Sequence, residues 1–286
     1  MKTRAPARPR NSPDRTRRLI VNVVLAIAAV VFLYPIAQMV VDSFKSNTEI
    51  MSNPGGLPIQ WTLSSYADVV SPERSLLRDL VNSIVIAGAS TACAVLFSAA
   101  AAYAFAKLSF PGRNALFAAL LMTMMVPPEV VVPGQFILFA RVGWINTLQA
   151  QILPEVTPIL GLFLIRQYMV TIPDELLEAA RLDGAGQLTI FLRIILPVSS
   201  PVLSAYAILH FLHVWNAYLW PTLVATDDAV KPIMVALPEL VDPLIGFLPI
   251  YGTIMAGCVL ATLPLAVVFF IFQDKFMSSV TIGAVK

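Results

Sequence analysis

The sequence predicts an all-α, polytopic membrane protein with six transmembrane helices. Of its 286 residues, 58% are hydrophobic and 13% are charged, and the mean hydropathy is +0.79. A soluble domain carries about a quarter charged residues. Apolar runs of about 20 residues, the length that crosses a bilayer, recur along the chain. Several runs are interrupted by proline, at Pro127-Pro128, Pro154, Pro158 and Pro264. This favours a kinked bundle around a solvent-lined interior, with simple kinking as the alternative.

The first predicted span covers residues 19–41 and follows a basic tail, residues 1–18. This run is too long for the apolar region of a cleaved signal peptide. An external loop follows at 42–79, with a short interfacial helix expected at 71–79. The remaining five helices form a core over residues 80–273, and 274–286 is a C-terminal tail. Their predicted bounds are 80–106, 114–140, 149–165, the central part of 194–226, and 243–273.

Basic residues are distributed unevenly between the predicted connecting segments. If the N-terminus is cytoplasmic, 14 of the 19 lysines and arginines fall in cytoplasmic segments and 5 fall outside. Short loops that retain Lys and Arg stay on the cytoplasmic side of the membrane. The distribution therefore predicts that both termini are cytoplasmic.

A charged segment at 166–199 cannot lie in hydrocarbon and is predicted to be a large cytoplasmic loop. Its first part, 173–183, is predicted to be a helix, with Thr171 and Asp174 as a capping box. Gly184 fits the left-handed position that ends a helix. A second short helix is expected at about 187–196.

The predicted helix has an apolar stripe at Ile172, Leu176 and Ala180, which repeat every four residues. The pair Ala179-Ala180 would permit close approach by another surface. The stripe therefore fits a docking helix. A solvated loop that lies against its own bundle is the alternative, and composition alone does not separate the two.

The same loop resembles the EAA signature of binding-protein-dependent ABC importer permeases. It contains Glu178-Ala179-Ala180, three residues, Gly184, nine residues, and then Ile194-x-Leu196-Pro197. The likeness extends over roughly residues 20–286 and is closest to the six-span carbohydrate permeases of the maltose-transporter type. The other matching motifs are Ser43-Phe44-Lys45, Thr62-Leu63-x-x-Tyr66, Asn82-Ser83, the run 102–107, Pro111-Gly112, Met125-Val126-Pro127, Gly143, Asn146-Thr147, Ile172-Pro173-x-Glu175-Leu176, Trp215-Asn216-x-Tyr218-Leu219 and the tail 283–286.

The resemblance implies a type I ABC importer permease fold with a cytoplasmic coupling helix, in a bacterial inner membrane. It also implies a second permease subunit, two copies of an ATPase subunit and an external solute-binding protein as partners. The chain contains no Gly-x-x-x-x-Gly-Lys-Ser/Thr phosphate loop, so ATP and Mg are expected on the ATPase subunits, and no cofactor in this chain. The residues expected to couple to the ATPase are Leu176, Glu178, Ala179, Ala180, Asp183 and Gly184.

Five residues are candidates for the translocation pathway. Glu129 and Glu155 are the charged residues inside the predicted spans, where ionisable groups are often functional. Trp215, Asn216 and Tyr218 offer aromatic and amide groups that suit a sugar. The alternatives are a position near the headgroups for the two glutamates and helix packing for Trp215.

The remaining chemistry-bearing residues predict no metal site. Cys93 and Cys258 lie in apolar runs and are expected to be small buried residues. His210 and His213 share a helix face and are expected to be hydrogen-bonded within the bundle. The net charge of +2 gives no indication of nucleic-acid binding. A secondary transporter or channel, or a membrane enzyme, stays open as an alternative on the residues alone, but neither needs the signature at 178–197.

Overall fold

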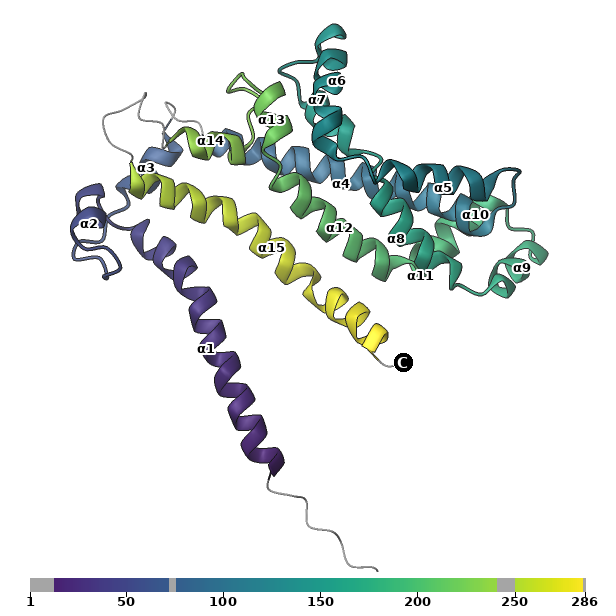
Figure 1. The fold of residues 1–286 in the computed structure, drawn as a ribbon, viewed down its shortest axis with the longest axis horizontal. Coiled ribbons are helices and arrows are strands. Elements are labelled where there is room, and N and C mark those ends of the chain that lie inside the picture. The colour runs from purple at the N-terminus through teal and green to yellow at the C-terminus, as the bar shows by residue number, and fades with distance from the viewer. Residues whose placement is uncertain (1–12, 72–75, 241–249, 285–286) are drawn as a thin grey trace, which may run out of the picture.

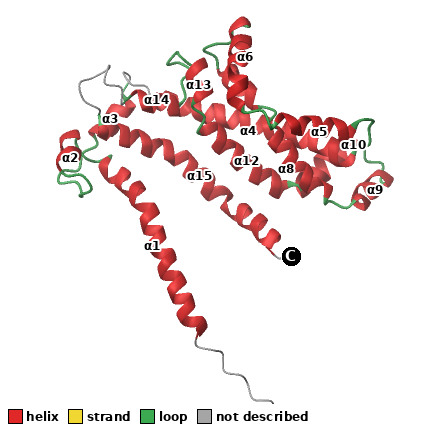
Figure 2. Cartoon of the chain, viewed as in Figure 1, coloured by secondary structure: helices red, strands yellow, loops and turns green. Residues whose placement is uncertain are grey.

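The computed structural model describes residues 13–71, 76–240 and 250–284. Throughout these residues the regular structure is helical, without a strand, and the helices form an elongated bundle (Figures 1 and 2). Four helical segments are long and apolar enough to cross a membrane, and six are if each of two bent pairs counts as one span. The predicted all-α membrane fold is confirmed.

Three of the spans are long continuous helices, namely α1 (Pro13–Asp42), α4 (Leu76–Lys107) and α15 (Tyr251–Ala284). The central helix is α4, which packs against α8 (Ile159–Val170) and α12 (Ser200–Trp215). By contrast, α1 meets the rest of the chain near its C-terminal end and diverges from the bundle along its length (Figure 1). The two larger apolar clusters among the described residues both include residues of α4.

The other spans are broken where proline removes backbone hydrogen bonds. The third consists of α5 (Arg113–Thr123) and α6 (Pro128–Arg141), bent by 94° at Pro127-Pro128. The fourth runs through α7 (Leu148–Ile152), a 3₁₀ turn at Leu153–Glu155 and α8. The fifth bends by 75° before α12. The sequence predicted interruptions in the third and fourth spans, but not bends of this size. It also predicted an interruption at Pro264 in the last span, where α15 instead continues as one helix.

The segments that were expected to be external differ from the prediction. The short helices there are α2 (Asn47–Ser52) and α3 (Ser64–Val70), so the interfacial helix expected at 71–79 is wrong. Residues 72–75 lie outside the described residues, and 76–79 form the first turn of α4. Two further short helices, α13 (Leu219–Val224) and α14 (Ile233–Glu239), were not expected.

Several predicted boundaries move. The fourth span continues to Val170, so Arg166 lies in a helix and not in the loop. Because α4 begins at Leu76, Arg78 and Asp79 also join the spans, and the two glutamates are not their only charged residues. The backbone of α15 continues through most of the expected tail, to Ala284. The predicted start of the last span, at 243, and residues 1–12 of the basic tail lie outside the described residues.

Candidate functional site

The charged loop folds into a short helix, α9 (Asp174–Leu182), at one end of the bundle, followed by α10 (Gln187–Ile190) (Figure 1). The expected capping box is wrong. Thr171 ends α8, and its hydroxyl donates to the carbonyl of Tyr168, so it cannot reach α9. Pro173 occupies the cap position instead, and Asp174 places negative charge in the first turn, where the helix dipole favours it.

The end of α9 has the expected left-handed glycine. Gly184 has a φ of +82°, a conformation that side chains other than glycine rarely adopt. The amide of Ala185 donates to the carbonyl of Ala180 at 2.9 Å, and that of Gly184 donates to Arg181 at 3.0 Å. These bonds satisfy carbonyls at the helix end and turn the chain back towards the bundle.

The two faces of α9 differ from the predicted stripe. Leu177 and Ala180 are buried in the core formed with α4 and α8, whereas Leu176 is 43% exposed and Leu182 is 90% exposed. The stripe that was expected to enter a partner is therefore divided, because Leu176 is exposed while Ala180 packs on the chain's own core. Leu177, three residues before Ala180, occupies the buried face in place of Leu176.

The other residues expected to couple to an ATPase lie on the exposed side. Glu178, Ala179, Asp183 and Gly184 are all exposed, and Ala180 faces the chain's own core. The loop thus combines both readings of the sequence, because one face packs on the bundle and the other is free.

Polar contacts tie this loop to the spans. The Lys107 ammonium donates to the carbonyl of Ile172 and to Asp174 Oδ1 at 2.7 Å, and its side chain is almost fully buried. The hydrogen bond from Lys107 lowers the pKa of Asp174 below its usual range. The Asp174 carboxylate therefore stays ionised at neutral pH, and its contribution is lost only as the pH falls through that lowered pKa.

One more polar contact attaches the loop. Tyr103 Oη donates to Gln187 Oε1 at 2.6 Å, which joins α4 to α10. Beside it, the spans contact one another: Arg166 Nε in α8 donates to the carbonyl of Phe105 in α4 at 3.3 Å, and its guanidinium lies 4.1 Å from the centre of the Phe117 ring in α5. The polar contacts therefore attach the loop to α4, at a point where α4, α5 and α8 meet.

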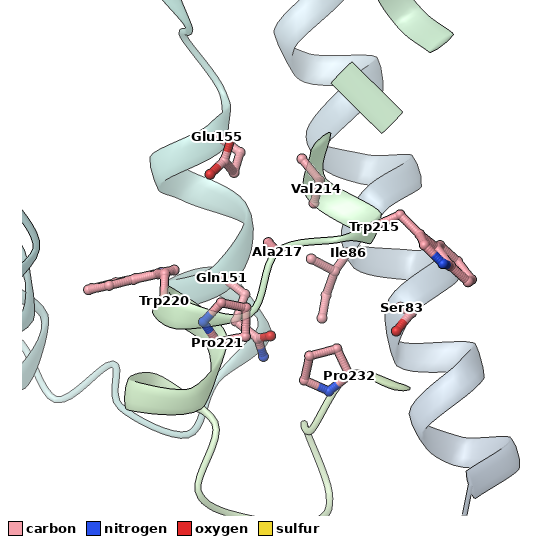
Figure 3. Close-up of a pocket in the computed structure, with 10 residues that line it drawn as sticks. All are labelled: Ser83, Ile86, Gln151, Glu155, Val214, Trp215, Ala217, Trp220, Pro221 and Pro232. Carbon is pink, nitrogen blue, oxygen red and sulfur yellow. The ribbon is translucent and has the colours of Figure 1, made fainter. Parts of the chain in front are cut away.

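A second feature is a narrow pocket of about 20 Å³ between the spans, with room for about one water molecule. Figure 3 shows Glu155, Gln151 and Trp220 on one side of it and Ser83 and Trp215 on the other. Gln151 Nε2 donates to the carbonyl of Val230, while Gln151 Oε1 is buried without a partner. The pocket thus combines aromatic and polar groups.

Glu155 lies at the break in the fourth span and faces two imidazoles. Its Oε2 is 3.5 Å from His213 Nε2 and 3.8 Å from His210 Nε2. His210 is buried, with Nδ1 3.2 Å from Thr91 Oγ1 and Nε2 3.1 Å from the Glu155 carbonyl, which confirms its expected hydrogen bonding. His213 is largely exposed. Sequence spacing alone did not connect Glu155 with these histidines.

The remaining pathway candidates separate in space. Trp215 is 2% exposed and stacks on Phe211 in a hydrophobic core, as the packing alternative requires. Asn216 and Tyr218 are exposed, and Asn216 Nδ2 donates to the carbonyl of Leu212 at 2.7 Å. Glu129 is exposed in the first turn of α6.

Among the described residues, no three His, Cys, Asp or Glu side chains lie together in a way that could hold a metal ion. Cys93 and Cys258 are free thiols and are partly buried. The candidate site thus consists of two features of the described residues, the pocket between the spans and the loop that contains α9.

The chain belongs to the family of binding-protein-dependent transport system inner membrane components, whose model matches residues 94–281. It is 32% identical to the arabinooligosaccharides transport system permease protein AraQ of Halalkalibacterium halodurans, over 93% of this chain and 96% of that protein. It is also 32% identical to the trehalose/maltose transport system permease protein MalG of Thermococcus litoralis, over 94% and 97%.

The fold has a close counterpart among solved structures. A chain in the crystal structure of a bacterial ABC transporter involved in the import of the acidic polysaccharide alginate superposes with a TM-score of 0.82. The match covers 95% of this chain and 100% of that one, at 22% sequence identity. The expected ABC importer permease fold and family membership are confirmed.

Proposed function

We propose that this chain is one transmembrane subunit of an ABC importer and forms half of the pathway for a carbohydrate or sugar-like solute. An external solute-binding protein delivers the solute, a second permease subunit completes the pathway, and two copies of a separate ATPase subunit bind ATP and Mg. The chain itself is not an enzyme. The observation that carries the proposal is α9, which packs on the bundle on one face, through Leu177, Ala180 and the Lys107–Asp174 ion pair, and is exposed on the other.

The exposed face of α9 is the proposed contact with the ATPase. Leu176 and Leu182 supply apolar surface, and Ala179 allows close approach. Glu178 and Asp183 supply charge, and Gly184 sets the turn. Ala180 contributes from the inner face by packing α9 on the bundle, so movement of α9 would be transmitted to the spans. Exposed apolar residues beside charges are typical of a docking surface.

The proposed solute class rests on the relatives and on the pocket. Both relatives reported above are named for saccharide transport systems. Glu155 offers a hydrogen-bond acceptor for hydroxyl groups, and Trp220 offers an aromatic face. We place Glu155, Asn216 and Tyr218 along the pathway, with Glu129 near its outer end and Trp215 as packing behind it.

The proposal is tested by purifying the tagged chain from mild detergent. The ATPase and a second permease subunit are expected in stoichiometric amounts, because a six-span chain without a phosphate loop cannot drive uptake alone. In vesicles with loaded binding protein, uptake from a panel of arabinose and maltose oligosaccharides should require ATP. A chain that purified alone and moved solute without ATP would support the secondary-transporter alternative.

The proposed topology is multi-pass in the inner membrane with both termini cytoplasmic, and it predicts which surface residues react from each side. In a Cys93→Ala, Cys258→Ala background, Leu188→Cys should react with an impermeant maleimide only in inverted vesicles. Leu188 is 69% exposed beside α9. Leu57→Cys, similarly exposed in the external loop, is the matched control and should react only from outside. Reaction of Leu188→Cys in intact cells would reject this orientation.

A further inference from the structure

Among the candidate spans of the described residues, α4 alone is a single helix without a break or an internal proline. Pro35 lies inside α1 and Pro264 inside α15, and the other three spans are bent or interrupted. Helices bend sharply at such features. The 32 residues of α4 extend for about 48 Å, so the helix exceeds the roughly 30 Å hydrocarbon core at both ends.

The N-terminal end of α4 holds the segment that connects α13 to α14. Asn82 Nδ2 donates to the carbonyls of Ala229 at 3.1 Å and Lys231 at 3.0 Å. Ser83 Oγ accepts from the amide of Ile233 at 2.8 Å. Both side chains are buried, so the bonds are not readily exchanged for water. In the proposed topology this is the outer face of the membrane.

The C-terminal end of α4 holds α9. The buried Lys107 ammonium is satisfied by Ile172 and Asp174, immediately before and at the start of α9. A buried charge needs such partners, and the loss of either leaves a costly unpaired group. Tyr103, one turn earlier in α4, holds Gln187 beyond α9. The last turns of α4, in the run 102–107, therefore hold the chain on both sides of α9.

We propose that α4 is a rigid rod that links the outer segment 229–233 to α9, with Asn82 and Lys107 as the positioning residues at its two ends. This rests on the proposed function, in which α9 contacts the ATPase. The broken spans can change angle at their hinges, whereas an unbroken helix held at both ends transmits displacement along its axis. Energetic coupling between two sites acts in both directions. Movement of α9 driven by ATP therefore shifts the outer segment, and movement of the outer segment shifts α9.

A simpler role for these contacts is local stability, and the two roles predict different double mutants. Asn82 and Lys107 lie about 38 Å apart along the helix, and distant sites with no shared partner have independent effects. If each contact only stabilises its own end of α4, the double variant should lose transport coupling by the product of the two single-variant factors. If both act through one rod, disconnection at either end removes the same coupling, and the second loss adds nothing.

The measurement is solute uptake per ATP hydrolysed, in vesicles that hold the complete transporter and loaded binding protein. We expect Lys107→Met and Asn82→Ala each to lower this ratio at least about fivefold while the complex still assembles. The double variant should be no worse than the more impaired single one. Lys107→Arg should restore most of the ratio, because it retains a cation within reach of both acceptors.

The matched control is Gln151→Ala. Gln151 holds the same outer segment through the Val230 carbonyl, but from α7 in a broken span. Its effect on the ratio should multiply with that of Lys107→Met. Arg113→Met removes another cation near the C-terminal end of α4, one whose hydrogen bond goes to the carbonyl of Leu108 and not to α9, and it should leave the ratio unchanged.

The proposal would be rejected if the single variants kept the wild-type uptake per ATP hydrolysed. It would also be rejected if the losses from Asn82→Ala and Lys107→Met multiplied in the double variant. If either variant fails to assemble, Ser83→Ala or Asp174→Asn replaces it at the same end of α4, and the same criterion applies. Failure of the underlying function is distinguishable, because the unmodified chain would then capture no ATPase and show no ATP-dependent uptake.

Discussion

Leu182→Asp is expected to abolish capture of the ATPase subunit. Leu182 is 90% exposed at the end of α9, beside the exposed Leu176 and Glu178. Burying a leucine in an interface contributes about 1.5–3 kcal/mol, and a carboxylate in its place must also be desolvated. Affinity for the ATPase should fall at least about 30-fold, and uptake should fall with it. The measurement is a pull-down from detergent together with ATPase activity in vesicles.

The same change at Leu57 is the matched control. Leu57 is similarly exposed, but it lies in the external loop. Leu57→Asp should retain the ATPase at the wild-type level, because the proposed contact lies on the opposite side of the membrane. Equal retention by both variants would remove the exposed face of α9 from the ATPase interface.

The sequence predicted the spans well because each depends on a long apolar run, which any fold must bury in lipid or protein. It also predicted Gly184 correctly, since a positive φ has a local residue signature. The predictions from sequence were wrong where contacts between distant segments determine which face of a helix is buried. The face of α9 that packs on the bundle is decided by its contacts with α4 and α8, which bury Leu177 and Ala180 and leave Leu176 exposed.

The short external helices were missed for related reasons. Both α3 and α14 are seven residues long, too short to show a clear helical period, and α14 contains Pro238. Ile233 is held by Ser83, which lies 150 residues earlier in the chain. The cluster of Glu155 with His210 and His213 is likewise a contact between the fourth and fifth spans. Spacing along one helix could relate the two histidines to each other, but not to Glu155.

Glu155→Gln is expected to lower uptake by about tenfold or more while assembly and basal ATP hydrolysis persist, since a hydrogen bond to a charged group contributes roughly 1.5–3 kcal/mol. A carboxylate at membrane depth costs about 2.5–3.5 kcal/mol when it faces lipid. Glu155 is 23% exposed and His213 is 68% exposed, so this polar face requires water or a partner beside it. A pathway for a hydroxyl-rich solute meets that requirement.

The comparison variant is Glu129→Gln, the same change in the other glutamate of the spans. Glu129 forms no ion pair with another described residue and lies in the first turn of α6, after the 94° bend, so a smaller loss is expected. The measurement is initial uptake rate against solute concentration in vesicles, with basal ATPase activity as the check on assembly. A Glu155→Gln rate within about twofold of wild type would mean that the removed charge made no contact in the transport step. Loss of assembly in Glu155→Gln would instead assign the carboxylate to packing between the fourth and fifth spans, through His210 and His213.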